Sequence, residues 1–242
     1  MGIYDRDYYR TPPPQVGAFQ MWTVTTWLIV INVAVYIVNS LIGSIVVDEY
    51  GQRYLVHPLF DLGYFSVATA LARFQIWRFL TFQFLHGGLT HLLFNMFSLY
   101  FFGPLIEAYL GRRRFLAFYL LCGIGGPILY VILWAIGILG SSEYVPLVGA
   151  SAGIFGVLIA AAQVAPNATV LIYGAIPARL RTLAWILLAV AVFTVFSYGQ
   201  SGRGNAGGEA AHLGGAAVGF LLIRKPQVLN VFERRPRASL RY

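Results

Sequence analysis

The sequence predicts an all-α, polytopic membrane protein built as a bundle of six transmembrane helices. Of its 242 residues, 58% are hydrophobic and only 11% are charged, and the mean hydropathy is +0.70. So few charged side chains do not cover a soluble globule of this size. Apolar runs close to the roughly 20 residues that a helix needs to cross a bilayer recur along the chain.

The predicted elements begin with a short cytoplasmic lead, residues 1–21, which contains three consecutive prolines and lacks the apolar core of a secretory signal. A membrane domain then occupies residues 22–224, and a basic cytoplasmic tail occupies residues 225–242. Within the membrane domain, the six expected spans are Trp22–Val46, Leu89–Leu110, Phe115–Leu139, Val148–Ala165, Thr182–Tyr198 and Glu209–Ile223.

The sixth expected span is the least hydrophobic, because it carries Glu209 and His212 among many Gly and Ala residues. Small residues let helix backbones approach closely, so this composition indicates a span buried among the others. The connection between the first two spans, about residues 47–88, is too long for a simple turn and is rich in aromatic residues. We expect it to pack as an interfacial element on the outer side of the membrane.

The basic residues predict the orientation of the bundle. Thirteen of the 17 Lys and Arg residues lie on one side of the expected spans, and only Arg53, Arg73, Arg78 and Arg203 lie on the other. The positive-inside rule therefore places both termini in the cytoplasm. The net charge of +8 is distributed around apolar runs, a layout that favours membrane lipids as partners and not nucleic acid.

Polar residues recur near the outer ends of the second, fourth and sixth spans, where they share a depth. Ser151 begins the fourth apolar run and His212 lies near the start of the sixth. Ionisable residues in a membrane span are expensive and usually functional, and a neutral imidazole can activate a serine hydroxyl. His91 and Asn95, four residues apart on one helix face, can supply donors for an oxyanion, as can the backbone N–H of Ser151.

Each of these residues also has a simpler interpretation. Ser151 can be a packing residue bonded to the preceding helical turn, His212 can make a plain interhelical hydrogen bond, and His91 with Asn95 can join two helices. The pattern Gly149-x-Ser151-x-Gly153 also matches the nucleophile elbow of α/β hydrolases. That elbow requires a preceding strand in a soluble fold, which this sequence does not predict.

Metal binding is the weaker alternative for the histidines. His57, His86 and His91 are candidate ligands, but the five-residue spacing of the last two does not place them on one helix face, and no carboxylate cluster accompanies them. Neither a metal nor a cofactor is therefore expected. Glu209, one turn before His212, is expected at the membrane interface and outside the catalytic pair.

Four motifs together resemble the rhomboid family of intramembrane serine proteases. They occur in the expected order, and the resemblance extends from the first span to the sixth. The motifs are Trp77-Arg78 in the outer loop, the block from Phe84 to Met96 that contains His86-Gly87-Gly88 and His91-x-x-x-Asn95, the serine motif Gly149-Ala150-Ser151-Ala152-Gly153, and Ala211-His212-Leu213-Gly214-Gly215.

The resemblance implies a catalytic dyad of Ser151 and His212 without an aspartate, and an oxyanion pocket formed by His91, Asn95 and the Ser151 backbone. It also implies that Phe155 packs on the catalytic imidazole, where some members of the family have Tyr. A second departure is Ala152, since rhomboids commonly have Gly directly after the serine. The supporting positions that the resemblance implies are Gly149, His86, Trp77 and Arg78.

The expected function is therefore that of an intramembrane serine endopeptidase that cleaves single-pass or polytopic membrane proteins in or near their transmembrane segments. Its expected location is the inner membrane of a bacterium. The alternative is a non-cleaving rhomboid-like protein that binds transmembrane helices. A solute transporter is a third class, and it is weaker because the sequence shows no inverted repeat or pair of broken helices. No oligomeric state is predicted.

Overall fold

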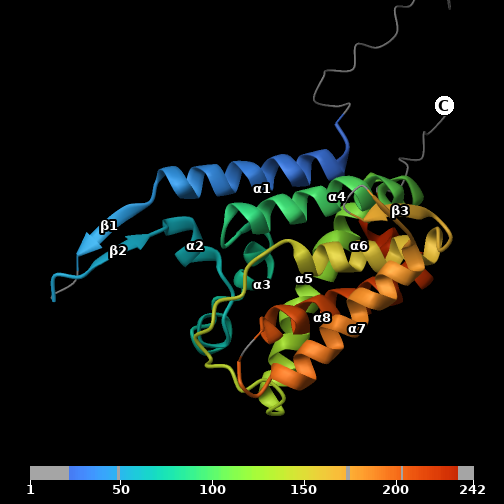
Figure 1. The fold of residues 1–242 in the computed structure, drawn as a ribbon. Coiled ribbons are helices and arrows are strands. Elements are labelled where there is room, and N and C mark those ends of the chain that lie inside the picture. The colour runs from blue at the N-terminus through green and yellow to red at the C-terminus, as the bar shows by residue number, and fades with distance from the viewer. Residues whose placement is uncertain (1–21, 48–49, 173–174, 203, 234–242) are drawn as a thin grey trace, which may run out of the picture.

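The fold was analysed in a computed structural model that describes residues 22–233, except 48–49, 173–174 and 203. Helices dominate it, and they pack into one bundle with a separate layer formed by the first helix (Figure 1). The predicted lead, residues 1–21, and residues 234–242 of the predicted tail lie outside the described residues.

Five helices are long and apolar enough to cross a membrane, which makes the chain an integral membrane protein. The predicted boundaries agree with them to within a few residues for all but the first span. These helices are α1 (Val24–Leu41), α4 (Leu89–Leu110), α5 (Arg112–Ala135), α7 (Leu180–Tyr198) and α8 (Ala206–Arg224).

The fourth predicted span, Val148–Ala165, is shorter than expected. Its helix, α6, covers only Ser151–Val164, 14 residues, or about 21 Å at 1.5 Å per residue. A hydrocarbon core about 30 Å thick exceeds this length. The expected count of six full spans is therefore corrected to five long helices and one short apolar helix among the described residues. Gly149, with a φ of 126°, has a backbone conformation that does not continue a right-handed helix, so α6 cannot extend toward the N-terminus.

The first predicted span, Trp22–Val46, was also too long. Helix α1 ends at Leu41, and Ser44–Val47 forms strand β1, which pairs antiparallel with β2 (Arg53–Val56). The run Ile45-Val46-Val47 is β-branched, and such residues favour strands. A second hairpin, β3 (Thr169–Ile172) with β4 (Ile176–Arg179), joins α6 to α7. The fold is thus mostly helical and not all-α.

The loop between α1 and α4 is folded into the β1–β2 hairpin and several short helices. The buried Arg78 side chain fixes this loop by donating hydrogen bonds to the Tyr64 carbonyl (2.6 Å), the Asp61 carbonyl (2.8 Å) and the Gln75 side chain (2.6 Å). Burial lowers the pKa of the Arg78 guanidinium. The short helices after β2 are α2 (Pro58–Gly63), the π-helix η4 (Ala68–Ala72), α3 (Arg78–Thr81) and the 3₁₀ helix η5 (Phe82–Phe84).

Helix α8 forms the centre of the bundle and packs against α5, α6 and α7, as its small residues predicted. At the contact with α6, a Cβ on Gly215 would overlap the carbonyl oxygen of Ala152, and a Cβ on Gly219 would lie 2.5 Å from the Cα of Gly156. At the contact with α5, a Cβ on Gly126 would lie 3.1 Å from the Ala211 carbonyl oxygen. Backbones this close leave no room for larger side chains.

A buried carboxylate joins α1 to α4. The Glu107 side chain accepts hydrogen bonds from the backbone N–H groups of Val24 (2.7 Å) and Thr25 (2.9 Å) and from the Thr25 hydroxyl (2.8 Å). It therefore satisfies two of the N–H groups that a helix leaves without partners at its first turn. A negative charge at this position is also favoured by the α1 helix dipole.

Replacement of Glu107 by Ala should lower the free energy of unfolding by about 2–4 kcal/mol, because buried donors at the start of α1 would lose their acceptor. Replacement by Gln, which keeps one oxygen acceptor, should cost less. Thermal unfolding of the purified protein in detergent measures both. Equal unfolding temperatures for the wild type and Glu107→Ala would show that the carboxylate does not hold α1.

Candidate active site

The segment before α6 is held in an extended conformation that presents Ser151 at the first position of the helix. Leu147 pairs with Phe65 through two backbone hydrogen bonds of 2.7 and 3.0 Å. The Gly149 N–H then donates to the Phe82 carbonyl at 2.9 Å. The folded outer loop therefore fixes the backbone directly before the serine.

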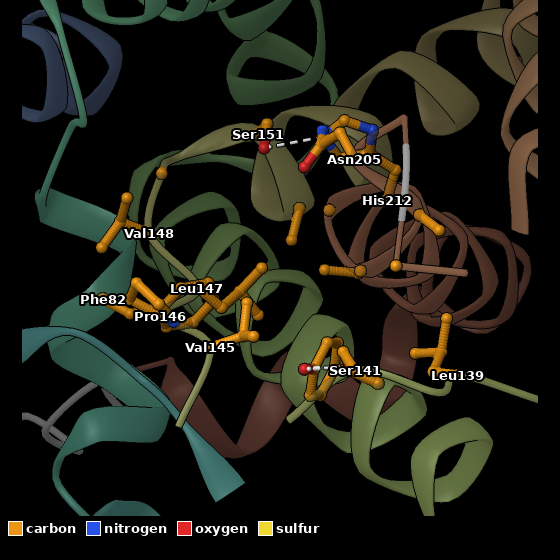
Figure 2. Close-up of a pocket in the computed structure, with 18 of the residues that line it drawn as sticks. Phe82, Leu139, Ser141, Val145, Pro146, Leu147, Val148, Ser151, Asn205 and His212 are labelled. Atoms are coloured by element: carbon orange, nitrogen blue, oxygen red, sulfur yellow. Dashed lines mark hydrogen bonds between the residues drawn. The ribbon is translucent and has the colours of Figure 1, made fainter. Parts of the chain in front are cut away.

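The structure brings Ser151 and His212 together. The Ser151 Oγ lies 2.8 Å from Nε2 of His212, in a hydrogen bond between the first turn of α6 and the second turn of α8 (Figure 2). The Phe155 ring, one turn further along α6, stacks on the imidazole with a centroid distance of 4.2 Å and an interplanar angle of 8°. The stacking restricts the plane of the imidazole.

His91 and Asn95 lie beside the serine segment. A Cβ on Gly149 would be 2.8 Å from Nε2 of His91 and 3.6 Å from Nδ2 of Asn95, so both α4 side chains reach the backbone two residues before Ser151. The Asn95 side chain is buried, and its Nδ2 has no hydrogen-bond partner among the described residues. A buried donor without an acceptor is costly and is a feature of sites that bind a ligand or a transient charge.

These four side chains line one cavity of about 740 Å³. Its walls come from α4, α5, α6, α8, Phe82 of η5 and two connections. The connection between α5 and α6 contributes Leu139, Ser141 and Val145–Val148, and the connection between α7 and α8 contributes Asn205 (Figure 2). The lining combines apolar surface with the polar groups of His91, Asn95, Ser151 and His212. A space of this kind, with few convergent polar groups, is typical of a substrate-binding site.

Three of the predicted supporting residues lie outside the lining of this cavity. The Trp77 side chain donates to the Leu62 carbonyl at 3.2 Å, and Arg78 binds the loop carbonyls described above, so both stabilise the outer loop. His86 is buried beside His91, with 5.1 Å between their ring centroids. Burial, with a smaller effect of His91, lowers the pKa of His86 to about 3, so its imidazole is neutral at physiological pH.

Glu209, which the sequence interpretation left outside the catalytic pair, contacts His212. Its Oε2 lies 2.9 Å from Nδ1 of His212, on the opposite edge of the imidazole from Ser151. The signal in the sequence was the spacing of three residues within one helix, which brings two side chains onto the same face. The expected position of Glu209 at the membrane interface stays a prediction.

The combination of apolar spanning helices with a hydrogen-bonded serine and histidine in a partly polar cavity defines an integral membrane protein with a candidate hydrolytic site. A family model for the rhomboid domain matches residues 73–225, which is more than half of the chain. The chain therefore belongs to the rhomboid family, as its motifs indicated. The match begins within the outer loop and ends just after α8.

Individual relatives agree with this assignment. The chain is 31% identical to RHOMBOID-like protein 4 of Arabidopsis thaliana over 90% of its own length and 56% of that protein. It is 30% identical to the rhomboid protease AarA of Providencia stuartii, over 82% of this chain and 70% of the relative. It is 34% identical to the rhomboid protease GluP of Bacillus subtilis, over 62% of this chain and 26% of that protein. The chain thus spans about half or less of the length of several curated relatives.

Replacement of Gly215 by Ala should destabilise the protein by about 1–3 kcal/mol, because the added methyl group would overlap the Ala152 carbonyl at the contact between α6 and α8. The matched control is Gly87→Ala, where the nearest atom to the new methyl group would be 4.0 Å away. Thermal unfolding of both variants in detergent tests this. If the two variants unfold at the same temperature, the tight contact does not limit stability.

Proposed function

We propose that this protein is an intramembrane serine endopeptidase that cleaves membrane-protein substrates in or near their transmembrane segments. The observation that carries the proposal is the hydrogen bond of 2.8 Å between Ser151 Oγ and His212 Nε2, within a cavity large enough for an extended peptide. A serine hydroxyl is a weak nucleophile unless an adjacent base takes its proton, and this pair has the required contact.

In the proposed reaction, His212 Nε2 accepts the proton of Ser151 Oγ while the oxygen attacks the scissile carbonyl carbon. The imidazolium then gives this proton to the leaving amine as the C–N bond breaks, which leaves an acyl group on Ser151. A water molecule, deprotonated by His212, attacks the acyl group, and Ser151 recovers its proton. No metal or cofactor takes part in these steps.

The proposed oxyanion pocket consists of Asn95 Nδ2, the His91 side chain and the backbone N–H of Ser151. The first N–H groups of a helix lack intrahelical acceptors and carry the positive end of the helix dipole. The Nδ2 of Asn95, which has no hydrogen-bond partner among the described residues, is a preformed donor close to Gly149, two residues before the serine. Donors that are fixed before the reaction stabilise the developing negative charge at little reorganisation cost.

We propose that the substrate is extended where it is cut. Ser151 is the first residue of α6, a helix of 14 residues that is shorter than α4 and α8. A helical substrate hides its carbonyl groups in its own hydrogen bonds, so the segment to be cut has to unwind. We further propose that both termini are cytoplasmic, from the distribution of basic residues, and that the protein resides in a bacterial inner membrane, as the bacterial relatives suggest.

Fluorophosphonate probes, which react with activated serines, should label the purified wild-type protein in detergent. Ser151→Ala removes the nucleophile and His212→Ala removes its base, so both variants should lose labelling while they keep their thermal unfolding temperature within a few degrees. Cleavage of a single-pass membrane protein in liposomes should disappear in parallel. A folded wild type that neither labels nor cleaves would favour the non-cleaving binder of transmembrane helices.

Asn95→Ala should reduce kcat by about 10²- to 10³-fold, with little change in KM, because it removes one donor to the oxyanion. Asn32→Ala is the matched control, since Asn32 is another buried amide in a membrane helix. Among the described residues, its side chain donates a hydrogen bond within its own helix, to the Leu28 carbonyl. Steady-state cleavage assays separate the two constants. A similar loss in both variants would indicate general destabilisation.

A further inference from the structure

The imidazole of His212 has side-chain partners at both ring nitrogens. Nε2 faces Ser151 Oγ at 2.8 Å, and Nδ1 faces the Oε2 of Glu209 at 2.9 Å. Glu209 and His212 lie three residues apart at the beginning of α8, so the helix itself holds them on one face. Both side chains are largely shielded, with exposed fractions of 20% for Glu209 and 15% for His212.

The contact with Glu209 selects the tautomer of the neutral imidazole. An ionised carboxylate only accepts hydrogen bonds, so Nδ1 carries the proton in this contact. Nε2 is then unprotonated and can accept the proton of Ser151 Oγ. The opposite tautomer would place an N–H against the serine and leave His212 unable to act as a base.

The contact also fixes the orientation of the ring. Stacking on Phe155 restricts the imidazole to a plane, but a half-turn about the Cβ–Cγ bond leaves the ring in the same plane. That half-turn would exchange Nε2 with Cε1 and Nδ1 with Cδ2, so neither hydrogen bond would survive. Stacking on Phe155 permits both ring orientations, and the hydrogen bond to Glu209 favours one of them.

The first turn of α8 fixes the place of Glu209 on the helix. The Glu209 N–H donates to the carbonyl of Asn205, the cap residue of α8, at 3.0 Å. As an acidic residue in the first turn, Glu209 also interacts favourably with the helix dipole of α8. The carboxylate itself contacts Nδ1 of His212.

We propose that Glu209 is a positioning residue for His212, which makes the site a Ser151–His212–Glu209 arrangement where the sequence motifs alone imply a dyad. The inference rests on the proposed function. Glu209 holds the Nδ1–H tautomer and the ring orientation before the reaction, and its negative charge stabilises the imidazolium while His212 carries the Ser151 proton. No proton passes to the carboxylate, so the proton count of the reaction is unchanged.

Three substitutions separate the effects of hydrogen bond, charge and reach. Glu209→Ala removes both the acceptor and the charge, so it should give mixed tautomers and reduce kcat by about 10- to 100-fold with KM within about twofold. Glu209→Gln keeps an oxygen acceptor but loses the charge, so it should retain the tautomer and still lose most of kcat. Glu209→Asp, a shorter carboxylate, should recover part of the rate. Glu143→Gln makes the same change at a partly exposed acid outside the cavity lining and should leave kcat unchanged.

The tautomer is read by ¹⁵N NMR of full-length protein with labelled histidine, and the His212 signals are assigned with His212→Asn. This readout does not depend on cleavage, so it remains informative if the protein proves not to be a protease. An Nδ1–H signal in the wild type that becomes mixed in Glu209→Ala supports positioning. An unchanged tautomer together with an unchanged kcat in Glu209→Ala would overturn the proposal, as would a kcat loss in Glu209→Gln that is matched by Glu143→Gln.

Discussion

The close contact between α6 and α8 determines the geometry of the Ser151–His212 pair at the candidate site. In a membrane, apolar helices gain little by leaving lipid for one another, so association depends on packing and on interhelical polar contacts. Here Gly156, Gly215 and Gly219 let the two backbones approach to a separation at which a serine on one helix and a histidine on the other can share a proton. The Ser151–His212 contact is short because the two helices meet at glycines.

Two charged side chains, Glu107 and Arg78, stabilise other parts of the fold through hydrogen bonds to the backbone. Glu107 caps α1 from α4, and Arg78 ties the carbonyl groups of the outer loop together. In both cases a charged group satisfies backbone atoms that would otherwise be unpaired in an environment with little water. The loop between α1 and α4 in turn holds the backbone before Ser151 through Phe65 and Phe82, so Arg78, which lies outside the cavity lining, still affects the position of Ser151.

Much of the site was predictable because its chemistry is unusual for a membrane span. Ser151, His212, His91 and Asn95 stood out as polar groups at a common depth, and the structure places all four around one cavity. Glu209 was left out of the catalytic pair because a carboxylate near a helix end was expected at the membrane interface, although helical spacing brings it onto the face of His212. Residues 44–46 were assigned to the first helix because hydropathy does not distinguish an apolar strand from an apolar helix. Only the local β-branched composition carried that information.

The late start of α6 bears on how a protein in lipid encloses a partly polar cavity. A bundle of equally long helices would fill this region with side chains. Here α6 begins only at Ser151, and the cavity lies where further turns of this helix would otherwise be. Leu147, Val148 and His91 line it. The start of α6, set by the left-handed backbone at Gly149, therefore limits how far this helix extends into the cavity.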